Sequence, residues 1–166
     1  MRLRPSSLWV VATTEVMTAP PLPGSLSLEI HADPLDFRRA SSWLRESGSA
    51  LAVPDAQIDR LELCLNEVLA NLVEHGGAAT AQHPIQLLLE AVPPPDGGGA
   101  RLVVSDRGEP FDSGQAGVKP IPGSLDEASP GGLGLRLVKA FSDGLAYRVV
   151  DGRNELRISM HWTPGS

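Results

Sequence analysis

The sequence contains little cysteine and few aromatic residues. Cys64 is its single cysteine, so an internal disulfide is excluded, and without a zinc-type Cys/His spacing no structural metal site is expected. Cys64 stands between leucines and is predicted to be a small, buried side chain. Aromatic residues make up 4% of the chain, so the core is predicted to consist mainly of Leu, Val, Ile and Ala.

Basic charge and long apolar runs are also scarce. Lys and Arg number 14 against 20 Asp and Glu, which gives a formal net charge of -6 and argues against a dedicated nucleic-acid-binding protein. No apolar run approaches the roughly 20 residues needed to cross a bilayer, and the short run at 8–12 lacks a convincing cleavage site for a signal peptide. A cytoplasmic protein without membrane contact is therefore expected.

The 166 residues and an apolar share of 42% predict one domain with its own core. Residues 1–24 show no clear period and are predicted to be a flexible N-terminal tail, residues 25–162 the folded domain, and residues 163–166 a C-terminal tail. Met17 could be the true start of the protein, and the sequence leaves this alternative open.

Alternation of apolar and polar residues predicts strands, whereas apolar residues at three- and four-residue steps predict helices. The expected order is strand 25–31, a helix from Pro34 to about Ser47 ended by Gly48, a helix from Asp55 stopped by Gly76 and Gly77, strands 85–92 and 101–106, a long loop 107–132, helix 133–141, and strands 145–150 and 155–162. This order indicates an α+β two-layer α/β sandwich, with a mixed sheet and helices on one of its faces.

Three polar residues at four-residue steps distinguish the second helix. Glu67, Asn71 and His75 lie on one slanting stripe, because four residues advance about 400° around an α-helix. Taken alone, Glu67 is best explained as a solvated glutamate. Asn71 lies near the apolar boundary beside Cys64 and would need hydrogen-bond partners if buried. His75 is predicted to be a structural residue at the C-terminal end of the helix, where a cation meets the negative end of the dipole.

Two later segments combine polar residues with glycines. Asp106-x-Gly108 follows a strand, so Asp106 either starts a turn or accepts a hydrogen bond from an exocyclic amine such as that of adenine, with Gly108 making room for a ligand. The segment 131–135 precedes a helix, where it is either a flexible hinge or a cradle of backbone N–H groups for phosphates.

In order and context, these segments resemble the N, G1 and G2 boxes of the Bergerat-fold (GHKL) ATP-binding superfamily. Glu67-x-x-x-Asn71 is similar to the N box, Asp106-x-Gly108 to the G1 box, and Gly132-x-Gly134 to the G2 box. The closing Gly152-x-Asn154-x-Leu156 and the Asp-x-Gly-x-Pro-Phe-Asp run at 106–112 narrow the resemblance to the anti-sigma factor serine/threonine-protein kinase branch. It covers about residues 25–162, the histidine kinase-like ATPase domain.

The resemblance implies an ATP site with Mg²⁺. Asp106 would read the adenine amine with Gly108 beside it, Asn71 would hold the magnesium ion, and Glu67 would be the catalytic base for a serine or threonine hydroxyl. Phosphates would be bound by the backbone at Gly131, Gly132, Leu133 and Gly134. The loop 107–130 would be a lid that orders on nucleotide binding.

The resemblance also implies partners. The expected substrate is an anti-sigma factor antagonist of the STAS type in a partner-switching pathway. A sigma factor is a second candidate partner, and family members commonly form homodimers. Two alternatives remain open. One is a non-catalytic ATP-binding module that sequesters a sigma factor or other regulator, and the other is an ATP-binding regulator unrelated to transcription.

Overall fold

A computed structural model describes residues 24–92, 98–108 and 132–163. The expectations for the N-terminal tail, for a start at Met17, for most of the lid and for residues 164–166 fall outside these ranges. Along the chain the elements are β1 (Ser25–Ile30), α1 (Pro34–Ala50), α2 (Asp55–His75), α3 (Gly77–Gln82), β2 (Ile85–Ala91), β3 (Gly98–Asp106), α4 (Gly132–Phe141), β4 (Gly144–Val150) and β5 (Arg153–Trp162).

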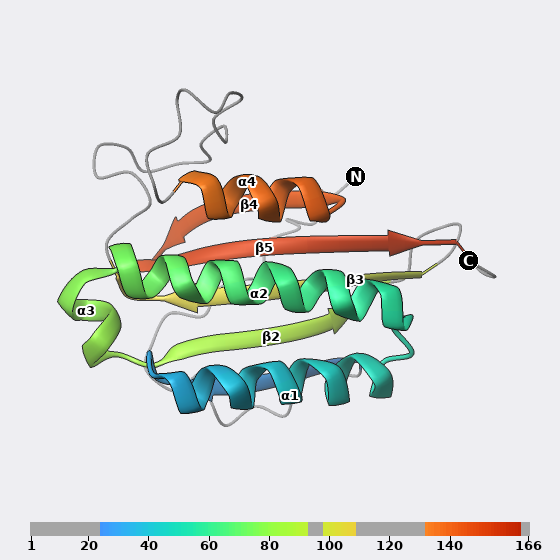
Figure 1. The fold of residues 1–166 in the computed structure, drawn as a ribbon, viewed down its shortest axis with the longest axis horizontal. Helices are drawn as coiled ribbons and strands as arrows, with labels where there is room; N and C mark the ends of the chain where they lie inside the picture. Colours follow the sequence, from blue (N-terminus) through green and yellow to red (C-terminus); the bar gives the residue numbers. More distant parts are fainter. Residues whose placement is uncertain (1–23, 93–97, 109–131, 164–166) are drawn as a thin grey trace, which may run out of the picture.

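The elements form two layers (Figure 1). The helices α1, α2 and α4 lie side by side in front of the sheet, and α2 is the middle one of the three. This arrangement confirms the predicted α+β sandwich with helices on one face. Within the ranges that the structure describes, no helix is both long and apolar enough to cross a membrane.

The sheet has the order β1-β2-β3-β5-β4, and all four neighbouring pairs are antiparallel. The expectation of a mixed sheet is therefore wrong. Two long helices connect β1 to β2, so the chain returns to the end that β1 left, and β2 runs in the opposite direction. The single helix α4 does make β4 parallel to β3, but β5 lies between these two strands.

The first helix begins as its sequence predicts. Asp33 is the N-cap and accepts a hydrogen bond from the backbone N–H of Asp36 at 2.9 Å, and Pro34 occupies the first turn. Gly48, however, does not end the helix, which continues to Ala50. A Cβ at Gly48 would lie 2.8 Å from Cγ1 of Ile58, so this glycine permits close packing of α1 against the start of α2.

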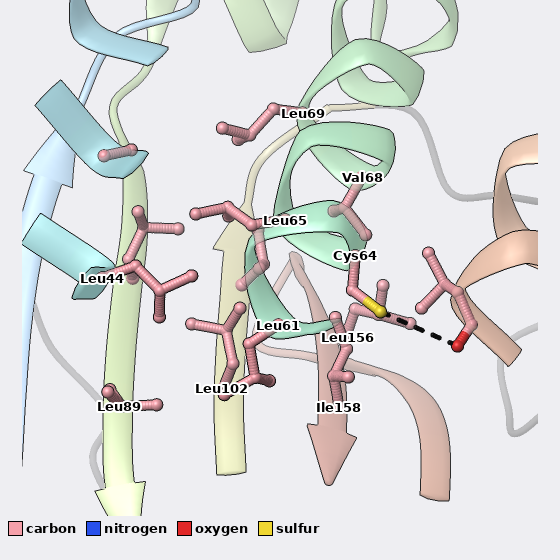
Figure 2. Packing of buried hydrophobic residues seen from close by; sticks show 14 of the residues in the cluster. Leu44, Leu61, Cys64, Leu65, Val68, Leu69, Leu89, Leu102, Leu156 and Ile158 are labelled. Atoms are coloured by element: carbon pink, nitrogen blue, oxygen red, sulfur yellow. Dashed lines mark hydrogen bonds between the residues drawn. The ribbon is translucent and has the colours of Figure 1, made fainter. Parts of the chain in front are cut away.

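The core is aliphatic, as the composition predicts. Figure 2 shows α2 placing Leu61, Leu65 and Leu69 between α1 and the sheet, while Cys64 and Val68 of the same helix lie toward α4. Among the described residues, every member of the buried cluster is aliphatic or sulfur-containing, and Phe37, Trp43, Tyr147 and Trp162 pack against it.

A substitution at Leu65 tests how strongly this core depends on α2. Its side chain is fully buried, so Leu65→Ala is expected to lower the free energy of unfolding by about 2–5 kcal/mol. Leu35→Ala is the matched control, because Leu35 is 69% exposed and its truncation is expected to change stability by about 0.5 kcal/mol or less. Urea denaturation of the two variants measures both values, and an equal loss in both would contradict the assignment of α2 as the core helix.

Other parts of the fold also differ from the sequence prediction. The helix α3 begins at Gly77, directly after Gly76, where two glycines and a run of small residues gave no helical signal. Strand β3 starts at Gly98, because β3 pairs with β5 along its full length and the indole of Trp162 covers Gly98. Strand β5 likewise starts at Arg153, two residues earlier than expected.

Candidate functional site

One end of the molecule gathers the segments that the sequence singled out (Figure 1). The strand β3 ends there, close to the C-terminal end of α2 and to α3, and both α4 and β5 begin there. Asp106 closes β3 opposite Asn154 of β5 in the strand register. The topology thus brings together residues that lie far apart in the sequence.

Asp106 is the centre of a buried polar cluster. The residue is 3% exposed, and its Oδ2 accepts hydrogen bonds from the backbone N–H of Gly108 at 2.6 Å and from Nδ2 of Asn154 at 3.3 Å. Asn154 also donates to the Gly108 carbonyl at 2.9 Å and accepts from the hydroxyl of Tyr147 at 2.8 Å. Asn154 therefore connects β4, the end of β3 and the following turn.

Burial sets the electrostatics of this cluster. It raises the pKa of the Asp106 carboxyl, while the Gly108 N–H, the Asn154 amide and the charge of Arg153 oppose this shift in part. A carboxylate that is shielded from water is stabilised strongly by each additional hydrogen-bond donor. Both hydrogen bonds that Asp106 accepts from side chains and backbone of the described residues go to Oδ2, so Oδ1 could accept one from a ligand N–H.

Gly108 stands where no side chain fits. A Cβ on this residue would overlap Oγ1 of Thr80 and would lie 2.7 Å from Oδ2 of Asp106 and 2.8 Å from the carbonyl oxygen of Gly76. Gly76 is similarly enclosed, because a Cβ there would also overlap Oγ1 of Thr80. Both positions therefore require glycine, because the turn after β3 packs closely against α3.

The stripe of Glu67, Asn71 and His75 on α2 reaches the same end of the molecule, and its three side chains are buried to different extents. Asn71 is 6% exposed, Glu67 is partly buried and His75 is exposed. Glu67 is therefore not a fully solvated residue. His75 occupies the last turn of α2, as predicted, and the backbone N–H of Gly76 closes the helix on the Leu72 carbonyl.

The residues of this end fit a magnesium ion that is bound together with phosphates. Within residues 24–92, 98–108 and 132–163, no three His, Cys, Asp or Glu side chains gather into a metal site of their own. Mg²⁺ in nucleotide sites commonly takes only one or two protein oxygens, with phosphate and water for the rest. The buried amide of Asn71 provides an oxygen of the hard type that Mg²⁺ prefers.

Two residues of α2 hold α4 in position. Arg60 donates from Nε to the Phe141 carbonyl at 2.9 Å, at the C-terminal end of α4, and its Nη2 lies 3.4 Å from Oδ1 of Asp143. Sγ of Cys64 lies 3.9 Å from the Val138 carbonyl (Figure 2), and burial raises the pKa of this thiol to about 11. The prediction of a buried Cys64 is confirmed.

The glycine-rich segment forms the start of α4. The helix begins at Gly132, one residue earlier than expected, so Gly132, Leu133 and Gly134 lie in its first turn. The N–H groups of a first turn have no partner within the helix and are available to an anion. Gly131 falls outside the residues that the structure describes.

Sequence patterns missed two residues of this site. Asn154 was noted only as part of a closing motif and received no role, because its contacts depend on the pairing of β3 with β5. Thr80 lies in the unexpected helix α3, and no spacing connects it with Asp106. The sequence signal for Asn154 was its place two residues after Gly152, and Thr80 had none.

Asn154 is a positioning residue whose removal is expected to loosen the Asp106 turn. Asn154→Ala takes a donor from a buried carboxylate and from the Gly108 carbonyl, so we expect stability to fall by about 1–3 kcal/mol. Tyr147→Phe removes only the hydroxyl on the far side of Asn154 and is expected to cost less. Urea denaturation compares the two variants. A larger loss in Tyr147→Phe would show that the phenol, rather than Asp106, is the important partner.

Comparisons with known proteins agree with this geometry. A family model described as a histidine kinase-like ATPase domain matches residues 30–160. The serine/threonine-protein kinase BtrW of Bordetella bronchiseptica is 40% identical over 108 residues, which cover 64% of this chain and 72% of that protein.

Among solved structures, the RsbU and RsbW domains of a Mycobacterium tuberculosis protein match with a TM-score of 0.55 and 20% identity. The match covers 84% of this chain but 32% of that longer chain, so it concerns the fold alone. The family match spans both the buried Asp106 cluster and the Glu67–Asn71 helix, and the chain therefore belongs to the histidine kinase-like ATPase domain family, whose description implies a site for ATP.

Proposed function

We propose that this protein is an ATP-binding serine/threonine-protein kinase of the anti-sigma factor type, which phosphorylates a STAS-type anti-sigma factor antagonist. The observation that carries the proposal is the buried Asp106 carboxylate at the end of β3, held by Gly108 and Asn154. A buried carboxylate whose described hydrogen bonds all go to one of its two oxygens suits the exocyclic amine of adenine.

The remaining roles follow from the arrangement of α2 and α4. Asn71 would supply an oxygen to Mg²⁺, which neutralises phosphate charge during phosphoryl transfer. The first-turn N–H groups of Gly132, Leu133 and Gly134 would bind the phosphates, together with Gly131. Binding there would give an acceptor to first-turn N–H groups, which have no partner within the helix itself.

Glu67 is the proposed catalytic base. It lies one turn before Asn71 on the same helix and is partly buried, so its carboxylate would stand beside the metal-bound phosphates. From there it would accept the proton of a substrate hydroxyl as the phosphoryl group arrives.

The partner is proposed from family likeness. The motifs of the chain resemble the anti-sigma factor kinase branch, and BtrW is named a serine/threonine-protein kinase. A phosphate on the antagonist would add about -1.5 to -2 charge and weaken its complex with this protein, whose own net charge is -6. A homodimer and a sigma factor partner belong to the same proposal.

Transfer of the γ-phosphoryl group tests the proposal directly. Wild-type protein is incubated with labelled ATP, Mg²⁺ and a STAS-type antagonist, and label is expected on a serine or threonine of the antagonist. Omitting Mg²⁺ is expected to abolish transfer. ATP binding without any transfer would favour the alternative, a non-catalytic ATP-binding module that sequesters a regulator.

A further inference from the structure

Arg153 is a charged residue next to the Asp106 cluster that the proposed roles do not use. It opens β5 and lies on the face of the sheet opposite the helices, because side chains alternate along a strand and its neighbour Asn154 shares the helix face with the core residue Leu156. Its Nε donates to Oγ of Ser105 at 3.0 Å, and its Nη2 donates to the Ser105 carbonyl at 3.3 Å. That carbonyl belongs to the peptide bond that joins Ser105 to Asp106.

Two successive residues of β5 therefore hold two successive residues of β3 from opposite faces of the sheet. Asn154 donates to Asp106 on the helix face, and Arg153 donates to Ser105 on the other face. The strand register, in which Asp106 lies opposite Asn154, sets both contacts. A guanidinium presents its N–H groups in a rigid planar fork, so its two bonds to Ser105 restrict the orientation of the peptide that precedes Asp106.

The contacts of Arg153 differ from those of its neighbours on the same face. Arg148 and Arg157 both donate to Oε1 of Glu155, at 2.9 and 2.7 Å. Within the described residues, Arg153 donates to Ser105 alone and contacts no carboxylate. Its positive charge is therefore not neutralised by an ion pair, and it acts on the charges around it.

Asp106 is one of the groups on which this charge acts. Burial raises the pKa of the Asp106 carboxyl, and the charge of Arg153 opposes the rise. Burial lowers the pKa of the Arg153 guanidinium, Arg107 adds to this lowering, and Asp106 and Glu29 oppose it. Three further titratable side chains near this end of the molecule are exposed to solvent, namely Glu74, His75 and His83.

We propose that Arg153 is a positioning residue of the nucleotide site, which holds the end of β3 from the face opposite the helices and whose charge keeps the Asp106 carboxylate ionised. This inference rests on the proposed ATP site, in which Asp106 accepts a hydrogen bond from the ligand. It explains how a carboxyl that is shielded from water remains an acceptor.

A carboxyl titration followed by NMR tests the charge effect without nucleotide. The full chain carries isotope-labelled aspartate, and the Asp106 signal is assigned by its absence in Asp106→Asn. Arg153→Gln removes the charge but keeps an amide donor, so we expect the pKa of Asp106 to rise, whereas Arg153→Lys keeps the charge and is expected to keep the wild-type pKa. Arg148→Gln is the matched control, because Arg148 contacts Glu155 rather than Ser105, and it is expected to leave the pKa of Asp106 unchanged.

Calorimetry over a pH series measures the consequence for ATP. Arg153 itself stays charged over this range. Above the folded pKa of Asp106 we expect Arg153→Gln to bind ATP within about twofold of wild type, and as pH falls through the raised pKa its Kd is expected to exceed the wild-type Kd by about threefold to tenfold. Arg153→Lys is expected to follow wild type throughout, and comparison at equal pH removes titration of the nucleotide.

Three results would overturn the inference. The pKa of Asp106 could stay at its wild-type value in Arg153→Gln, or it could rise as much in Arg148→Gln. An affinity loss of equal size at every pH in both Arg153 variants would assign Arg153 a structural role alone. A wild type that bound no ATP would instead overturn the proposed function, and the NMR titration would still decide whether Arg153 keeps Asp106 ionised.

Discussion

Glu67→Gln is expected to lower the rate of phosphoryl transfer by about 10²- to 10⁴-fold while leaving the Kd for Mg-ATP within about threefold. The amide keeps the shape of the side chain but cannot take up a proton, and general-base catalysis contributes about this factor. Single-turnover transfer of label to the antagonist gives the rate, and calorimetry gives the Kd.

Two variants on the same helix make the Glu67 result specific. Glu74→Gln makes the identical change at an exposed carboxylate and is expected to transfer phosphate at the wild-type rate. Asn71→Ala removes the proposed magnesium ligand and is expected to weaken Mg-ATP binding itself. If Glu67→Gln transfers phosphate as fast as wild type, Glu67 is not the base.

Asp106→Asn is expected to weaken ATP binding by about 10- to 100-fold, the range for losing a hydrogen bond to a charged group. The same variant is expected to be more stable than wild type at neutral pH, because burial raises the pKa of the Asp106 carboxyl and disfavours its charged form. Asp151→Asn, at an exposed turn position with φ 51°, serves as the matched control and is expected to change neither quantity.

The pH dependence has a definite sign. The folded pKa of Asp106 lies above its unfolded value of 3.8, so between these two values the folded protein binds more protons. Wild-type stability therefore decreases as pH rises through this window, and the decrease is absent in Asp106→Asn. ATP affinity changes in the opposite direction, because protonation as pH falls through the folded pKa removes an acceptor for the amine.

Calorimetry and urea denaturation over a pH series measure both trends. Asp106→Asn supplies the baseline that removes titration of the nucleotide itself. A wild type whose stability rises with pH through this window, relative to Asp106→Asn, would contradict the electrostatic account of the site.

Local patterns predicted most of the fold because each element carries its own signal. The Asp33 cap, the apolar stripe of α2 and the alternation in β2 all depend on neighbouring residues, and the structure confirms these elements. The sheet direction was missed because it depends on which strand lies between β3 and β4. Gly48 was misinterpreted as a helix end. The structural reason for a glycine at this position is its close contact with Ile58, which belongs to another helix.

The candidate site was likewise predicted only where its residues belong to local sequence motifs. Asp106, Gly108 and Asn71 were found because they belong to short motifs, whereas the contacts of Asn154 and Thr80 arise only in three dimensions. Asn154 reaches Asp106 across 48 positions of sequence. Thr80 approaches Gly108 through a helix of six residues with no apolar period.

The thiol of Cys64 offers a measurement that needs no introduced probe. It is the single thiol of the chain, it is fully buried beside α4, and its pKa of about 11 keeps it in the unreactive thiol form at neutral pH. Alkylation therefore requires α4 to separate from α2. The labelling rate with and without nucleotide reports how often this separation occurs, and so whether ligand at the start of α4 changes the lifetime of the contact at its other end.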